Sequence, residues 1–146
     1  MNIPIPALPY QLFFEHRPDY LYAYVSCDDL NLDIAKDYWR EIMSMLHRRR
    51  YKRVMLEKNV VERLPPEDVH KLVSELTRSG CSTMVFALVD QCYDQERAAF
   101  EESAGSRGGL NMKVFDDVRN AEKWMLSIDT HRLVYVQAAA LATMAL

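Results

Sequence analysis

Two short apolar runs near the start of the chain have the length and composition of β-strands. They cover residues 10–16 and 20–26. The segment Arg17-Pro18-Asp19-Tyr20 between them has proline at the second position, where a type I turn favours it. The two runs therefore predict an antiparallel hairpin.

After the hairpin, apolar side chains recur at every fourth residue, which is not the spacing of a strand. The residues on the stripe are Ile34, Tyr38, Ile42 and Leu46. Such spacing places apolar side chains on one face of a helix. Asn31 is suited to cap the start of this helix, and the cations of residues 47–50 stand near its negative C-terminal end. We predict an amphipathic helix here.

Strand and helix patterns then alternate to residue 126. The expected strands are 53–57, 84–89 and 111–115, and the expected helices begin at Pro65-Pro66, Cys92 and Asp117. Strands that are joined through single helices run parallel, with right-handed crossovers. The sequence therefore predicts an α/β fold: a single mixed β-sheet of about five strands, with an antiparallel edge hairpin, the other strands parallel, and about four helices.

The chain of 146 residues is long enough for one domain. We divide it into an extended, proline-containing arm (1–9), a domain (10–127) and an apolar C-terminal tail (128–146). Residues 133–146 carry no charged side chain but are too few to cross a bilayer, which takes about 20 apolar residues. We expect the tail to pack on its own domain or on a second chain, and we predict a homodimer. The alternative is a tail that is foreign to the native chain or poorly ordered.

The composition restricts which cellular compartment and which classes of partner we expect for this chain. The net charge is -3, from 18 basic and 21 acidic residues, so no excess of positive charge attracts nucleic acid. The three cysteines show no CxxC spacing, which favours a reducing, cytoplasmic setting without a structural zinc site. No secretory or transmembrane segment is visible. We predict no metal, no cofactor and no nucleic-acid partner.

The segment from Gly108 to Asp117, followed by Ala121 and Trp124, resembles the closing part of SpoIIAA-like (STAS/SEC14-type) bacterial domains. In those domains a glycine-containing turn leads to a short strand that ends in Val-Phe, and then to a helix whose Ala and Trp face the sheet. The resemblance implies that Phe115 and Trp124 are core residues. Truncation of a buried tryptophan to alanine is expected to cost about 3–5 kcal/mol.

The resemblance also bears on function. Anti-sigma-factor antagonists of this fold carry a phosphorylatable serine at the start of the helix after the third strand, whereas no Ser or Thr occurs here between Arg53 and Ser74. We therefore expect the loop Asn59–Leu64 to be exposed but not phosphorylated. The resemblance implies a non-enzymatic regulatory or protein-binding module, and its SEC14 side implies an alternative, a carrier or sensor of a small apolar, lipid-like ligand.

Several residues are candidates for a partner or ligand surface: Tyr20, Tyr22, Tyr24, Asn59, Glu62, Leu64, Asp90, Cys92 and Tyr93. The three tyrosines alternate with apolar residues, so they share one sheet face, either as caps of the core or as an interface. Cys92 follows a buried strand near a helix start, where a thiol pKa can fall, but no histidine is close in the sequence. An ordinary cysteine is favoured, and no catalytic residue is predicted.

A basic patch follows the first predicted helix, and its members are Arg48, Arg49, Arg50, Lys52 and Arg53. It could face phosphate or acidic lipid, but a solvated helix end is favoured. Glu67 and His70 lack the second such pair that a di-iron site needs. The glycines of residues 105–109 precede a strand rather than a helix, so they indicate a turn and not a phosphate loop.

Overall fold

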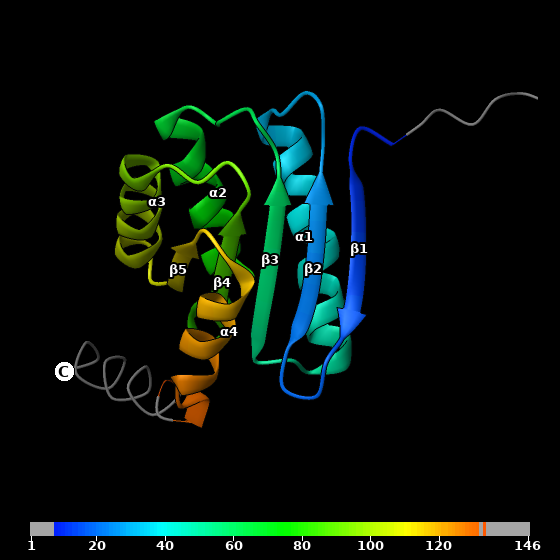
Figure 1. Cartoon of the computed structure of the whole chain (residues 1–146), viewed down its shortest axis with the longest axis vertical. Coiled ribbons are helices and arrows are strands. Elements are labelled where there is room, and N and C mark those ends of the chain that lie inside the picture. The colour runs from blue at the N-terminus through cyan, green and yellow to red at the C-terminus, as the bar shows by residue number, and fades with distance from the viewer. Residues whose placement is uncertain (1–7, 132, 134–146) are drawn as a thin grey trace, which may run out of the picture.

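The computed structural model describes residues 8–131 and 133, and within them five strands form one sheet with four α-helices around it (Figure 1). The strands are β1 (Gln11–His16), β2 (Leu21–Ser26), β3 (Arg53–Asn59), β4 (Val85–Asp90) and β5 (Asn111–Phe115). The helices are α1 (Leu32–Arg49), α2 (Pro66–Arg78), α3 (Gln95–Arg107) and α4 (Val118–Ser127), with a short 3-10 helix η1 (Cys81–Thr83) before β4. This order agrees with the prediction.

The sheet has the strand order β1-β2-β3-β4-β5. β1 pairs antiparallel with β2, and every other neighbouring pair is parallel. The predicted fold class, a mixed sheet with an antiparallel edge hairpin, is therefore confirmed. β1 and β5 form the two edges.

The two faces of the sheet are covered unequally. Helices α1, α2 and α3 pack on one face and enclose the larger core, with Ile42, Leu56 and Phe86 among its fully buried side chains. On the other face α4 packs over β3, β4 and β5, where Met125 contacts a second core that includes Met55. Figure 1 shows no helix in front of β1 and β2. Among the described residues, the part of this face formed by β1 and β2 is consequently open.

Local capping explains the element boundaries. The side chain of Asn31 accepts a hydrogen bond from the backbone N–H of Ile34 at 2.9 Å, as predicted. Asp94 caps α3 in the same way through Arg97 N–H at 2.9 Å, so this helix begins at Gln95 and not at Cys92. Gly80 adopts a left-handed backbone (φ 86°) after α2, as the sequence predicts.

Trp124 packs against the smaller core, as predicted, but it is only partly buried, whereas its neighbour Met125 is fully buried. Its ring centroid lies 5.7 Å from that of the partly buried Phe115. The prediction that the loop Asn59–Leu64 is exposed is wrong at two positions, because Val60 and Leu64 insert into the larger core.

Most of the predicted tail lies outside the described residues, as do residues 1–7 of the predicted arm. The described residues Ile128 and Leu133 pack against the core beneath α4. No helix in the described part of the chain is long and apolar enough to cross a membrane.

The packing of α4 generates a stability prediction. Met125→Ala should destabilise the domain by about 3 kcal/mol, because it leaves a cavity in a fully buried position. Trp124→Ala should cost less, since the indole is partly in water already. Chemical denaturation of both variants measures the difference, and a larger loss for Trp124→Ala would show that α4 is rotated relative to this description.

Candidate functional site

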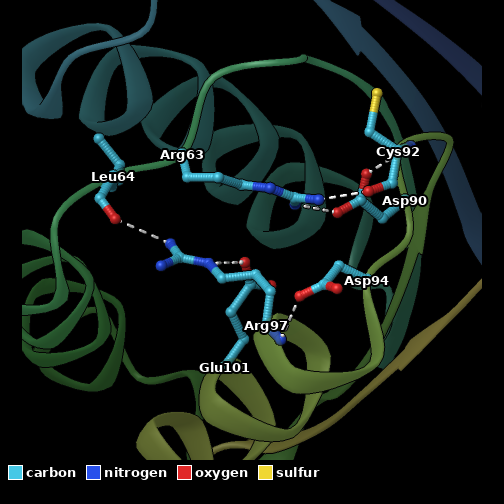
Figure 2. A network of polar contacts seen from close by, with 7 residues as sticks. All are labelled: Arg63, Leu64, Asp90, Cys92, Asp94, Arg97 and Glu101. Carbon is cyan, nitrogen blue, oxygen red and sulfur yellow. Dashed lines mark hydrogen bonds and ion pairs between the residues drawn. The ribbon is translucent and has the colours of Figure 1, made fainter.

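A polar network gathers at the carboxyl ends of β3 and β4 (Figure 2). Asp90, the last residue of β4, is only 4% exposed and forms an ion pair with Arg63 from the loop after β3. Arg63 also donates to the backbone carbonyl of Cys92, and the other Asp90 oxygen accepts the Cys92 N–H at 2.8 Å. Because a buried carboxylate needs a compensating charge, this pair fixes the loop to the end of β4.

A second arginine holds the same end of the loop, at the residue after Arg63. Arg97, in the first turn of α3, donates through Nη2 to the carbonyl oxygen of Leu64 at 3.0 Å. Its Nε lies 3.0 Å from Oε1 of Glu101, which is 8% exposed. Glu62, the residue before Arg63, accepts the backbone N–H of Leu30 at 3.0 Å. The loop Asn59–Leu64 is therefore anchored to three other segments.

An apolar cavity of about 70 Å³ lies under this loop, between the sheet and helices α1, α2 and α3. Its apolar walls include Trp39, Leu64, Leu72, Leu76, Phe86 and Leu88. Charged side chains also line it, among them Lys58, Arg63 and the Arg97–Glu101 pair. The arrangement of an apolar interior with a few convergent polar groups is typical of small-molecule sites.

Tyr38 of α1 also lines this cavity and was assigned by sequence periodicity only to the helix core. Burial raises the pKa of its phenol far above the ordinary value, and the charges of Cys27, Glu101 and Asp90 raise that pKa further. The hydroxyl is therefore neutral and can donate a hydrogen bond. Arg63 and Arg97 were likewise missed, because Asp90 and Leu64, which they contact, are distant in the sequence. The Arg97–Glu101 pair has the i,i+4 spacing of a helix, a local signal that could have found it.

The open half of the sheet carries two of the three predicted tyrosines. We call Phe13, Tyr22, Tyr24 and Glu57 the open face. Tyr22 donates to Glu57, Asn59 Nδ2 donates to the Tyr24 hydroxyl at 3.2 Å, and Phe13, 60% exposed, has its ring centroid 6.4 Å from that of Tyr24. Burial and the Glu57 carboxylate both raise the pKa of Tyr22.

Tyr20 lies on the same sheet face as Tyr22 and Tyr24 but is less exposed than they are. Its side chain is buried beside α4, and its hydroxyl donates to Glu122 Oε2 at 2.5 Å. The interpretation of all three tyrosines as one accessible surface is therefore wrong for Tyr20. Tyr93 is exposed in a separate shallow groove with Phe115 and Trp124, apart from both the network and the open face.

The residues of the predicted basic patch also fall into two groups, one exposed and one that makes internal contacts. Arg48, Arg49, Arg50 and Lys52 are exposed at the end of α1, as expected for a solvated helix terminus. Arg53 is directed elsewhere: its guanidinium donates to the backbone carbonyls of Met125 at 3.2 Å and Ile128 at 2.7 Å. It thereby fixes the end of α4 to β3 and is not part of the exposed patch.

The cysteines are unpaired and differ in environment. Burial raises the pKa of the Cys81 thiol to about 12, and burial followed by the Glu62 charge raises that of Cys27. Both thiols are therefore poor nucleophiles at neutral pH. Cys92 takes part in the polar network through its backbone. Within residues 8–131 and 133, no group of three or more His, Cys, Asp or Glu side chains could hold a metal ion.

Comparisons with known proteins identify the fold. No protein-family model and no curated protein matches the sequence. The structure is similar to that of an uncharacterized protein of the DUF3478 family from Shewanella loihica PV-4, which has a SpoIIAA-like fold. The TM-score is 0.53 and the sequence identity is 12%, and the match covers 85% of this chain and 99% of that chain. The NMR structure of the protein TM1081 matches with a TM-score of 0.48 and 14% identity, over 84% of this chain and 92% of that chain. The first similarity shows that this domain has a SpoIIAA-like fold.

The Arg63–Asp90 pair generates a stability prediction for the network. Arg63→Met should destabilise the domain by about 3 kcal/mol at neutral pH, because it leaves the Asp90 charge buried without a partner. The double variant Arg63→Met/Asp90→Asn should recover most of this loss. Denaturant unfolding of the two single variants and the double variant measures the coupling, and additive losses would contradict a direct pairing.

Proposed function

We propose that this SpoIIAA-like domain is a non-enzymatic regulatory or protein-binding module that binds its partner through the open face. One observation carries the proposal: no helix of the described residues covers the sheet surface over β1 and β2, which presents Phe13 to solvent beside Tyr24. Aromatic side chains are enriched in protein interfaces, and tyrosine combines a large contact area with a polar end.

The open face is also ordered before any partner binds. Tyr22 is held by Glu57, and the second Glu57 oxygen accepts a hydrogen bond from Gln91 Nε2 at 2.9 Å. Tyr24 is held by Asn59. Side chains that are already fixed lose little conformational entropy on association, which favours binding at this surface.

A second copy of the chain is the partner that we propose first. β1 is an edge strand, so the backbone groups on its outer side are not paired within the sheet, and strand addition could extend the sheet there. Two-fold pairing along β1 would place two open faces side by side in one interface. Symmetric dimers are the commonest assembly of this kind.

Regulation by phosphate on the loop after β3 is not part of this proposal. The loop has no hydroxyl, and the two arginines at its C-terminal end, Arg63 in the loop and Arg97 beside Leu64, are already engaged in internal ion pairs. The three unpaired cysteines fit a reducing compartment, so we place the protein in the cytoplasm.

A second candidate function is a carrier or sensor of a small apolar ligand, which the cavity under the loop favours. A cavity of about 70 Å³ is roughly half the 150 Å³ cavity that holds benzene in an engineered core. The part of a ligand that it encloses is therefore small, and a whole lipid chain does not fit without a rearrangement of the loop.

Light scattering tests the protein-binding proposal. The full-length chain should be a dimer, and Phe13→Ser should weaken it at least about tenfold, as expected for an aromatic residue central to an interface. Val61→Ser is the matched control, because Val61 is 76% exposed but lies outside the open face, and it should leave the dimer unchanged. A monomeric full-length chain, or a dimer that is insensitive to Phe13→Ser, would contradict the proposal.

A shortened chain that ends at Asp129 separates the open face from the C-terminal tail. If the open face is the interface, the shortened chain should dimerise as strongly as the full-length chain. If the full-length chain is a dimer and the shortened chain is a monomer, the interface is formed by the C-terminal tail instead. Circular dichroism of the shortened chain checks that removal of the Leu133 contact leaves the domain folded.

A further inference from the structure

The cavity under the loop contains a buried phenol whose hydroxyl makes no hydrogen bond to any described residue. Tyr38 is 2% exposed, and its ring lies against Tyr10 and Trp39, with centroids 6.0 Å and 6.2 Å away. Neither contact involves the hydroxyl. No fully enclosed side-chain nitrogen or oxygen of the described residues lacks a partner, so this hydroxyl stays within reach of a water-sized molecule. Tyrosine hydroxyls in such places ordinarily have a hydrogen-bond partner. In this cavity such a partner can come from a bound molecule.

The surrounding charges restrict the chemistry of that molecule. Three cations, Lys58, Arg63 and Arg97, are balanced there by the carboxylates of Glu62, Asp90 and Glu101. Because both arginines are already paired with Asp90 and Glu101, the cavity offers little net attraction to a further anion. Asp90 and Glu101 also act on the Tyr38 phenol and raise its pKa, and an anionic group at the same position would meet the same repulsion. A neutral oxygen that accepts a hydrogen bond suits the site better.

The walls and the volume restrict the rest of the molecule. Leu72, Leu76 and Met112 present apolar surface, and the cavity of about 70 Å³ has room for only a few carbon atoms. An apolar body of this size gains from burial, while its oxygen takes up the phenol donor.

We propose that this cavity binds a small neutral molecule with a compact apolar body and one oxygen that accepts a hydrogen bond from Tyr38, such as a short-chain or small-ring ketone or alcohol. The inference rests on the second candidate function above, the binding of a small apolar ligand. It adds a chemical class for that ligand and a residue that selects it.

Two isosteric probes test the selection. Acetone and isobutene have similar shapes and only four heavy atoms each, which suits the volume of the cavity, but only the ketone has an accepting oxygen. In NMR titrations of the full-length protein, observed through the amides of residues that line the cavity, the ketone should bind at least about threefold more tightly than the alkene. Tyr38→Phe should abolish this preference and leave the affinity for the alkene unchanged.

Tyr10→Phe is the matched control. It removes a hydroxyl from the neighbouring ring, but that hydroxyl donates to Glu41 at 2.8 Å, and Tyr10 does not line the cavity. The preference for the ketone should persist in this variant. Leu72→Phe, which fills the cavity from α2, should weaken both probes and provides a second test if Tyr38→Phe fails to fold.

The outcomes distinguish this inference from the function on which it rests. If both probes bind the wild-type protein equally, or if the preference survives in Tyr38→Phe, the role of Tyr38 is refuted while binding of apolar molecules stands. If neither probe binds, the apolar-ligand function is refuted as well. The dimerisation experiment is independent of every one of these results.

Discussion

The burial of β4 on both faces is the constraint on which the rest of the structure depends. All six residues from Val85 to Asp90 are buried, so the strand needs apolar cover on each side of the sheet. Helices α1, α2 and α3 supply one side, and α4 supplies the other over β3, β4 and β5. The hairpin β1–β2 therefore keeps one face in water. The open face is thus a direct consequence of covering this side of β4 with a single helix.

The same constraint produces the polar network. A strand that is buried to its last residue carries the Asp90 carboxylate into the interior, and Arg63 must follow it to compensate the charge. Arg63 belongs to the loop after β3, so the ion pair draws this loop across the end of the sheet, where Arg97 holds Leu64. The cavity is closed from above by this loop. In SpoIIAA-like domains the resemblance associates this loop with a phosphorylated serine, whereas here internal ion pairs hold the loop in place.

Local pattern was sufficient for the order of elements but not for the pairs that build the site. The spacing of apolar residues predicted β5 with its observed ends and a parallel arrangement of the strands after the hairpin. The capping residue Asn31 predicted where α1 begins. The contacts of Arg63 with Asp90 and of Arg97 with Leu64 join residues about thirty positions apart, which no local pattern encodes. Periodicity placed Tyr38 on the buried face of its helix but could not show that its hydroxyl is left without a partner. Trp124 is less buried than the resemblance implies, because two adjacent residues of α4 both border the smaller core and Met125 is the fully buried one.

The end of β4 also connects the two surfaces. Asp90 is held by Arg63 on the cavity side, and the next residue, Gln91, donates to Glu57, which in turn accepts from Tyr22 on the open face. Contacts through Asp90, Gln91 and Glu57 therefore run from the loop beside the cavity to the aromatic residues of the open face. Coupling between the two sites would require that this chain of contacts have two arrangements with different affinities. The cavity and the open face thus meet at a single strand end, which is the place where such coupling would have to act.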